Sequence, residues 1–228
     1  GDSAVEVPWT LYMESGDVQV LANSYDLISD WIDEVDGYLS PDGVWDRKPD
    51  YPLGQLGDWL DPTAPPEDPT LAMTEKELVA TAFYARSCMQ GTQIAHILGK
   101  TEDEARFAAL RDRVVTGFLQ RFTNLDGTMT SDTQCAYALA IAFGLLDGEP
   151  VRRVKAGNRL ACLVRESGGK VSTGFAGTPF VLPALTMTGH NDEAYALLTS
   201  IECPSWLYQV TMGATTTWER WDSMRADG

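Results

Sequence analysis

Residues 94–104 read Ile94-Ala95-His96-Ile97-Leu98-Gly99-Lys100-Thr101-Glu102-Asp103-Glu104, and this stretch joins two predicted helices. Apolar residues recur at helical spacing before it, and Gly99-Lys100 ends that helix. Thr101 then caps the next helix, whose acidic first turn suits a helix N-terminus. Because the link is so short, the two helices must fold back on each other as a helical hairpin.

The same pattern recurs along the chain at Gly16-Asp17, Gly148-Glu149 and Gly189-His190, each of which separates two apolar-periodic segments. Longer connections lie between these pairs, as is typical of an (α/α) toroid that carries its function at the loop end. We therefore expect an all-α fold, an incomplete (α/α)6 barrel of helical hairpins with about four of its six hairpins present. The predicted helices cover residues 4–14, 18–35, 74–98, 101–121, 136–146, 150–163, 180–187 and 193–201.

Two further segments are predicted outside this pattern. Val44-Trp45 is predicted as a short strand, and residues 47–70 as a long proline-rich loop. A structureless loop of that length inside a compact domain is usually functional. The C-terminal residues 203–222 show no apolar periodicity, so we expect neither a core helix nor a half-buried strand there.

Composition narrows the class of protein. A chain of 228 residues with 44% hydrophobic content can form one packed domain. Its net charge of −16 argues against binding to nucleic acid or to an anionic membrane surface, and no apolar run reaches transmembrane length. The chain starts without Met and stops at the turn signal Asp227-Gly228, so we expect a fragment of a longer protein. No compartment is predicted.

Cysteine and histidine usage predicts neither a metal ion nor another cofactor. The four cysteines are far apart in the chain, and Cys88, Cys135 and Cys162 lie among apolar neighbours, where we expect buried thiols. His96 and His190 are the only histidines, and neither has a partner at ligand spacing. A histidine-dependent catalytic triad is equally unfavoured.

Carboxylates and aromatic residues collect in the loops, and above all in Trp218-Glu219-Arg220-Trp221. Aromatic rings outside a core stripe can form platforms on which sugars stack. Hydrolysis of a glycoside with inversion needs two carboxyl groups roughly 6.5–9.5 Å apart. These residue types favour a glycosidase in which Glu219 is an acid or a base, although the tryptophans could instead plug the end of a helical domain.

Several of these loop residues have simpler structural interpretations, which the sequence leaves open. Gly174 and Gly177 lack the strand and the lysine of a phosphate-binding loop, so we discount that motif. The alternatives are an N-cap role for Asp2 and Asp132 (with Gln134 merely following Asp132), a turn role for Asp58, a core position for Trp59, and solvated loop positions for Asp61 and Asp222.

The chain resembles bacterial α-L-rhamnosidases of glycoside hydrolase family 78, in stretches that run its whole length in the expected order. Together these stretches are more specific than any one of them. They are Gly1-Asp2-Ser3-Ala4-Val5 with Val7-Pro8-Trp9, Gly57-Asp58-Trp59-Leu60-Asp61-Pro62 with Thr63-Ala64-Pro65-Pro66, Ser131-Asp132-Thr133-Gln134, Thr173-Gly174-Phe175 with Gly177-Thr178-Pro179, and Pro204-Ser205-Trp206 with Thr215-Thr216-Thr217-Trp218-Glu219-Arg220-Trp221.

The resemblance implies a partial (α/α)6 catalytic domain over residues 1–228 and an inverting hydrolysis of terminal α-L-rhamnose from rhamnose-containing oligosaccharides or glycosides. It implies that Glu219 is the general base, which deprotonates the attacking water. The residues that it implies in sugar binding are Asp2, through the rhamnose hydroxyls, Trp59 as an aromatic wall with Asp58 beside it, and Trp206 and Trp218 as pocket neighbours.

One departure from the family concerns the general acid. In the family this is a Glu in an Asp-Glu-Arg stretch just before the counterpart of Gly1-Asp2, and that stretch is absent here. We therefore expect the isolated chain to be inactive and its full-length parent to be active. Two other readings remain open: another inverting (α/α)6 glycosidase, of a fucosidase- or glucoamylase-like kind, and a non-catalytic helical carbohydrate-binding or scaffold protein.

Overall fold

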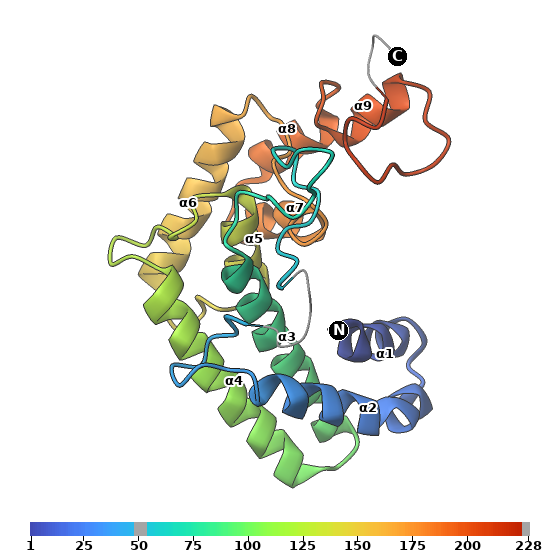
Figure 1. The fold of residues 1–228 in the computed structure, drawn as a ribbon, viewed down its shortest axis with the longest axis vertical. Helices are drawn as coiled ribbons and strands as arrows, with labels where there is room; N and C mark the ends of the chain where they lie inside the picture. The colour runs from blue at the N-terminus through green and yellow to red at the C-terminus, as the bar shows by residue number, and fades with distance from the viewer. Residues whose placement is uncertain (48–53, 225–228) are drawn as a thin grey trace. The chain divides into compact units, whose positions relative to one another are not determined.

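The computed structural model describes residues 1–47 and 54–224, and within these ranges the regular structure is helical (Figure 1). An isolated β-bridge between Thr123 and Met129 is the one β feature of the described residues. The all-α prediction is therefore confirmed. The helices are α1 (Ser3–Ser15), α2 (Val18–Asp36), α3 (Lys76–Ile97), α4 (Thr101–Phe122), α5 (Gln134–Ala142), α6 (Pro150–Glu166), α7 (Thr178–Met187), α8 (Asn191–Thr199) and α9 (Trp206–Thr211).

The contacts within the chain group it into two compact units. The first contains Gly1–Gln55 and Ala80–Arg121, and the second contains Leu56–Val79 and Phe122–Gly228. The expectation of one domain over residues 1–228, and of an incomplete toroid, stays a prediction. None of the described helices is both long and apolar enough to cross a lipid bilayer.

The first unit is built on one apolar face of α2. The buried residues of this helix recur at helical spacing, so they form a stripe that faces the core. A Cβ on Gly91 of α3 would lie 2.5 Å from Ile32 Cδ1 of α2 and 3.3 Å from Phe107 Cδ2 of α4, so the three helices meet at this glycine. The residues of the stripe are Leu21, Tyr25, Ile28, Ile32 and Val35.

The tight links have the predicted form. Gly16 and Gly99 end α1 and α3 with φ of 70°, in the left-handed region that glycine adopts without strain. Asp17 then caps α2, because its carboxylate accepts a hydrogen bond of 2.9 Å from Gln19 N. α1 and α2 pack against each other, as do α5 and α6, and α7 and α8.

The predicted strand at Val44-Trp45 is wrong, because these residues have no strand to pair with among the described residues. Trp45 is buried instead, and its backbone N–H donates to Thr81 Oγ1 of α3 at 3.1 Å. A side-chain hydroxyl thus replaces the ladder partner that a strand would have supplied.

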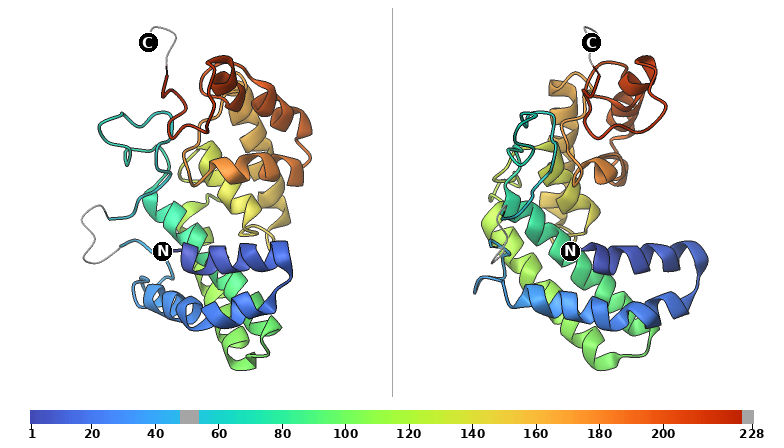
Figure 2. Two further views of the ribbon diagram at one scale, coloured as in Figure 1. Left: turned by 90° about the vertical axis from the view of Figure 1, so that its right-hand side faces the viewer. Right: turned by 45° about the vertical axis from the view of Figure 1, so that its right-hand side comes forward.

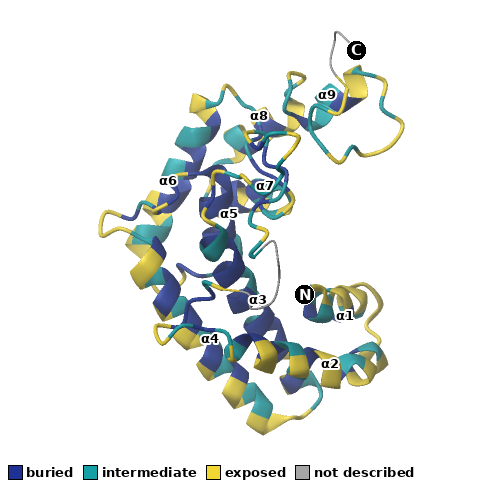
Figure 3. Ribbon diagram, in the orientation of Figure 1, coloured by how far each residue is buried: buried dark blue, intermediate teal, exposed yellow. Residues whose placement is uncertain are grey.

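The second unit is built around α5, whose residues from Gln134 to Ile141 are all buried (Figure 3). A helix that is apolar on every side has to lie inside the protein, and α5 packs against both α6 and α7. A Cβ on Gly157 of α6 would lie 2.6 Å from Thr188 Cβ, so a small residue allows α6 to approach the end of α7.

The long connections of the second unit are hydrogen-bonded to one another. Glu75 N donates to Ser131 Oγ at 3.0 Å, and Val171 N donates to Pro204 O at 3.1 Å. Residues 54–75 run as a loop without a helix (Figure 2), which agrees with the expected long loop. The Pro49 and Pro52 positions of that predicted loop lie outside the described residues.

The C-terminal segment contains one helix that we did not predict. α9 is six residues long, and Ser205 caps it by accepting a hydrogen bond of 3.1 Å from Tyr208 N. Six residues make fewer than two turns, so the 3.6-residue periodicity has no room to show in the sequence.

Replacing Leu139 of α5 by Ala should lower the free energy of unfolding by about 2–5 kcal/mol, because its side chain is fully buried and would leave a cavity. The control is Val151→Ala on α6, where the side chain is 69% exposed and we expect a change within about 0.5 kcal/mol. Urea-induced unfolding measures both. Equal midpoints for the two variants would contradict the central place of α5.

Candidate functional site

A pocket of ≈ 220 Å³ opens among the loops of the second unit. It brings together three residues that the sequence analysis singled out for the site, Trp206, Trp218 and Glu219. Its remaining lining comes from the long loop of residues 54–75, the glycine-rich loop of residues 173–177, α7, α9 and the C-terminal segment. These residues are Leu60, Gly174, Phe175, Thr178, Pro179, Gln209, Thr217 and Trp221.

Two edge-to-face ring pairs hold the indoles of this pocket. The ring centroids of Trp206 and Trp221 lie 5.4 Å apart at an interplanar angle of 88°, and those of Tyr208 and Trp218 lie 6.3 Å apart at 82°. Both distances fall in the range where the positive edge of one ring favours the negative face of another. These ring contacts therefore hold the three indoles in place around the pocket.

Hydrogen bonds tie the same segment to the rest of the unit. Trp221 Nε1 donates to Thr173 O at 2.9 Å, which joins the C-terminal segment to the glycine-rich loop. Trp218 N donates to the side-chain oxygen of Gln209, on α9, at 3.1 Å. The backbone that carries Glu219 is therefore held on both sides.

The Glu219 side chain lines the pocket and belongs to an exposed residue. It makes no hydrogen bond or ion pair with any other described residue. Arg220, its neighbour in sequence, binds other groups instead of Glu219. Its guanidinium donates to Ala64 O at 3.2 and 3.3 Å, and its Nε pairs with Asp222 at 3.0 Å. The carboxylate is therefore available to a water molecule or a ligand.

Asp58 is fully buried, and its predicted place beside the sugar stays a prediction. Its Oδ2 accepts a hydrogen bond of 2.8 Å from Gly174 N, and its Oδ1 accepts one of 2.9 Å from Gly177 N. The side chain thus binds the glycine-rich loop instead of facing the pocket. Burial raises the pKa of this carboxyl to about 6, although both N–H donors and the Cys135 thiol act to lower it.

Trp59 is half-buried, so neither a core position nor an open platform describes it. Its backbone carbonyl accepts a hydrogen bond of 2.9 Å from Phe175 N, which links it to the pocket wall through the backbone. The role of its indole as a wall for the sugar stays a prediction.

Asp61, expected as a solvated loop acid, is 1% exposed. Its carboxylate accepts hydrogen bonds from Thr63 N at 2.6 Å and from Met73 N at 3.0 Å. Asp61 therefore joins two parts of the same long loop. Asp222, the second acid expected to be solvated, is half-buried and paired with Arg220.

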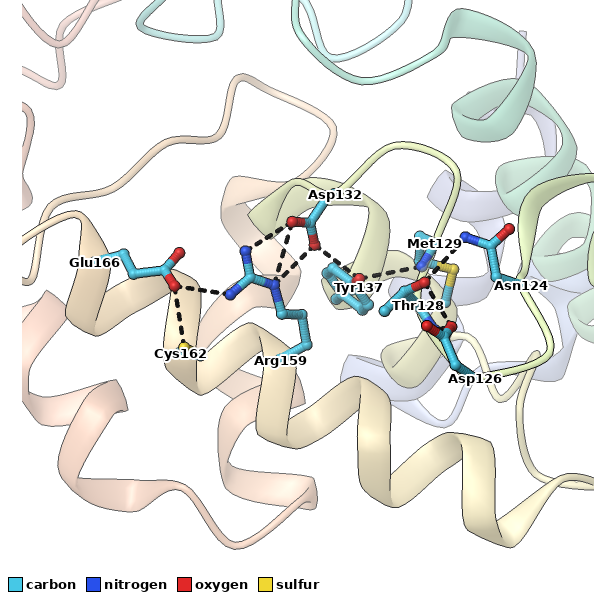
Figure 4. A network of polar contacts seen from close by, with 9 residues as sticks. All are labelled: Asn124, Asp126, Thr128, Met129, Asp132, Tyr137, Arg159, Cys162 and Glu166. Carbon is cyan, nitrogen blue, oxygen red and sulfur yellow. Dashed lines mark hydrogen bonds and ion pairs between the residues drawn. The ribbon is translucent and has the colours of Figure 1, made fainter.

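Asp132 is not the N-cap of α5, because Thr133 takes that place through a hydrogen bond of 3.2 Å from Ala136 N. Asp132 instead accepts two arms of the Arg159 guanidinium and a hydrogen bond of 2.8 Å from the Tyr137 hydroxyl (Figure 4). Arg159 lowers the pKa of the Asp132 carboxyl. This residue joins α6 to the loop before α5 and takes no part in the pocket.

Gln134, expected merely to follow Asp132, has a structural role of its own. It is buried, and its side-chain oxygen accepts a hydrogen bond of 3.0 Å from Ser172 N while its Nε2 donates to Lys170 O at 3.0 Å. The amide thereby pairs with the backbone that leads into the glycine-rich loop.

Asp2, in the first unit, occupies the expected N-cap position of α1, but its side chain makes no capping hydrogen bond. Its carboxylate accepts a hydrogen bond of 3.2 Å from Ser87 Oγ on α3. Burial raises the pKa of Asp2, and the bond from Ser87 partly offsets this. One turn later, Glu6 receives two hydrogen bonds from Arg86, at 2.7 and 2.9 Å, which fix α1 against α3.

The predictions for cysteine are confirmed in part. Cys88 and Cys135 are buried thiols, whereas Cys162 is half-exposed and hydrogen-bonds Glu166 at 3.2 Å. Across residues 1–47 and 54–224, no group of three or more His, Cys, Asp or Glu side chains is placed to hold a metal ion.

A larger cavity of ≈ 430 Å³ lies between the end of α6 and α8. Its lining contains no aromatic side chain, and of its two carboxylates, Asp192 and Glu193, the second is paired with Arg165. The tryptophan-lined pocket is therefore the better candidate for a site that combines binding with acid–base chemistry.

Comparison with known proteins gives consistent matches. Residues 1–228 match the family model of the bacterial alpha-L-rhamnosidase 6 hairpin glycosidase domain. An α-L-rhamnosidase of Streptomyces avermitilis is 38% identical over 228 residues, which are 100% of this chain and 20% of the relative. One of Formosa agariphila is 34% identical over 230 residues, which are 100% of this chain and 24% of the relative.

Solved structures agree with these matches. The structure of an α-L-rhamnosidase from Aspergillus terreus superposes with a TM-score of 0.92 at 38% identity, over 100% of this chain and 26% of that chain. The Streptomyces avermitilis enzyme complexed with L-rhamnose gives a TM-score of 0.85 at 37% identity, over 100% of this chain and 20% of that chain. This chain thus spans a fifth to a quarter of the length of these relatives.

The buried Asp58 predicts an unusual pH dependence of stability. Its folded-state pKa of about 6 exceeds the ordinary 3.8, so between these values the native protein holds a proton that the unfolded chain has lost. This contribution is full below pH 3.8 and is lost as the pH rises through 6. The free energy of unfolding of the wild type, minus that of Asp58→Asn, should fall by roughly 2–3 kcal/mol from pH 4 to 7.

Urea unfolding at several pH values between 4 and 7 measures this difference. Asp132→Asn is the control of opposite sign, because a lowered pKa gives a contribution that is lost as the pH falls. A flat difference between wild type and Asp58→Asn would contradict the raised pKa.

Proposed function

Because this chain belongs to the family of bacterial α-L-rhamnosidase six-hairpin glycosidase domains, we propose that it is part of the catalytic domain of an enzyme that hydrolyses terminal α-L-rhamnose. The substrates proposed are rhamnose-containing oligosaccharides or glycosides. The observation that carries the proposal is the Glu219 carboxylate, which has no partner among the described residues and lies on a pocket lined by three tryptophans.

The pocket has the features that a sugar ring needs. Indole rings offer flat apolar surfaces against which the C–H groups of a sugar stack, and Gln209 adds a polar side chain. Its volume of ≈ 220 Å³ is below the roughly 300–1,000 Å³ of sites for drug-sized ligands. The size supports a single terminal sugar rather than a longer stretch of oligosaccharide.

In the proposed mechanism Glu219 is the general base of an inverting hydrolysis. It would take a proton from the water that attacks the anomeric carbon, while a second carboxyl group protonates the leaving oxygen. A base must be ionised and free to accept, and the Glu219 side chain has no competing partner among the described residues. From the resemblance to family 78, we propose that the acid lies upstream of these 228 residues.

Other residues are proposed to bind the sugar. Trp206 and Trp218 would contact it from the pocket walls, since both line the pocket. Asp2 is proposed to accept hydrogen bonds from rhamnose hydroxyls, and Trp59 to form a further aromatic wall, both from the resemblance to family 78. Their positions relative to Glu219 in the complete enzyme are part of this proposal.

Replacing Glu219 by Gln in the full-length protein should lower kcat on an aryl α-L-rhamnoside by about 10²–10⁴-fold with little change in KM, since the amide keeps the shape but cannot take the proton. The matched control is Glu202→Gln, an exposed glutamate outside the pocket, which should retain full activity. If Glu219→Gln keeps its kcat, a non-catalytic role of this pocket is favoured.

The sugar itself is tested with a panel of aryl glycosides. The full-length protein should prefer the α-L-rhamnoside over the α-L-fucoside and the α-D-glucoside. Proton NMR of the first product formed should show inversion at the anomeric carbon. Preference for a fucoside or glucoside would assign the site to another inverting glycosidase, and retention would exclude Glu219 as an inverting base.

Replacing Trp206 by Ala should raise KM about tenfold or more, because it removes a pocket wall and the edge contact with Trp221. Trp9→Ala on α1 is a matched control, since this indole lies outside the pocket lining. Steady-state kinetics on the aryl rhamnoside measure both. Equal KM values for the two variants would remove Trp206 from the proposed binding site.

A further inference from the structure

We infer that Asp58 is a positioning residue, which sets the shape of the tryptophan-lined pocket by holding the loop from Thr173 to Thr178. The inference rests on the proposed function, because it concerns the same sugar pocket. It assigns to Asp58 a role behind the pocket wall, with no direct contact to the sugar.

The hydrogen bonds of Asp58 support this role. Its two carboxylate oxygens take the N–H groups of Gly174 and Gly177, one each, at 2.8 and 2.9 Å. Bonds from N–H donors to an ionised acceptor are about twice as strong as neutral ones. The side chain is 0% exposed, so water cannot replace it as an acceptor.

Both glycines are needed for the loop to come this close. A Cβ on Gly174 would lie 2.2 Å from Trp59 O and 2.3 Å from Asp58 O, which no side chain can tolerate. A Cβ on Gly177 would lie 2.9 Å from Cys135 Cβ. The motif Gly174-x-x-Gly177 is therefore explained by the close packing of this loop against the Asp58 backbone and α5.

The held loop is itself a wall of the pocket. Phe175 and Thr178 line it, and Phe175 N donates to Trp59 O at 2.9 Å. The carbonyl of Thr173 receives the indole N–H of Trp221, another lining residue. A shift of the loop would therefore move an aromatic residue on each side of the pocket.

A second layer fixes Asp58. The Cys135 thiol of α5 hydrogen-bonds its carboxylate, and burial raises the pKa of this thiol well above its ordinary value, so it stays a donor. The hydroxyl of Thr74 also interacts with the Cys135 thiol and acts to lower its pKa. The same hydroxyl hydrogen-bonds Thr133 Oγ1, at the start of α5, at 2.7 Å. Through Asp58, the loop from Thr173 to Thr178 is thus held against α5, the buried helix of this unit.

The direct test is hydrogen exchange of the free full-length protein at pH 7.5. Asp58→Asn replaces one acceptor oxygen by an NH2 group, which cannot accept from a backbone N–H. We expect amides of residues 173–178 to exchange at least tenfold faster in this variant. Asp61→Asn is the matched control, because Asp61 is equally buried in the same loop but holds Thr63 and Met73 instead; its residues 173–178 should exchange as in the wild type.

Kinetics give the second readout. Asp58→Asn should raise KM for an aryl α-L-rhamnoside about tenfold or more and change kcat by less than about threefold, the opposite split from Glu219→Gln. Gly177→Ala, with Asp58 intact, should show the same split because it displaces the same loop. If the Asp58→Asn protein does not fold, Gly177→Ala takes its place in both the hydrogen-exchange and the kinetic measurements.

The outcomes separate this inference from the proposed function. Unchanged exchange of residues 173–178 in Asp58→Asn, or in Gly177→Ala if it is used instead, would overturn the positioning role. Raised KM together with unchanged exchange in the free protein would instead assign Asp58 a direct contact with the sugar. Faster exchange in a protein whose wild type hydrolyses no rhamnoside would support the positioning role and overturn the proposed function.

Discussion

A buried carboxylate with two backbone donors is the interaction on which the pocket of this chain depends. Removing a charge from water is costly, and the structure compensates with two N–H groups and a thiol, each aimed at Asp58. The compensation requires the donor loop to approach within a distance that only glycine allows. The burial of one acid therefore fixes the backbone of a loop more than a hundred residues away in sequence.

The acids of the second unit differ in their surroundings. Asp61 is buried and binds backbone N–H groups, Asp132 is paired with Arg159, and Asp222 is paired with Arg220. Glu219 is exposed beside three indoles and has no such partner among the described residues. The availability of its lone pairs, more than any property of the residue type, makes it the acid suited to acid–base chemistry.

The helices supply the rigid frame for this arrangement. α5 is apolar on all sides and buried, and it carries at its N-terminal end Thr133, Gln134 and Cys135, which bind the loops. A site held by a buried helix is better ordered than one held by loops alone. The loops can therefore lack regular structure and still present a defined pocket wall.

The helices and the tight glycine links were predictable from the sequence, because helical periodicity and glycine breaks are local signals. The sequence also singled out Glu219, which lines the pocket, and its role as the base stays a proposal. The short helix α9 and the coil at Trp45 were not, since one is too short to show a period and the other depends on a hydroxyl from α3. The roles of Asp58, Asp61 and Asp132 were decided only by tertiary structure. The sequence around a loop aspartate does not show its partners. Residues from distant segments of the chain surround it in the folded protein, and they determine whether it is solvated, paired or buried.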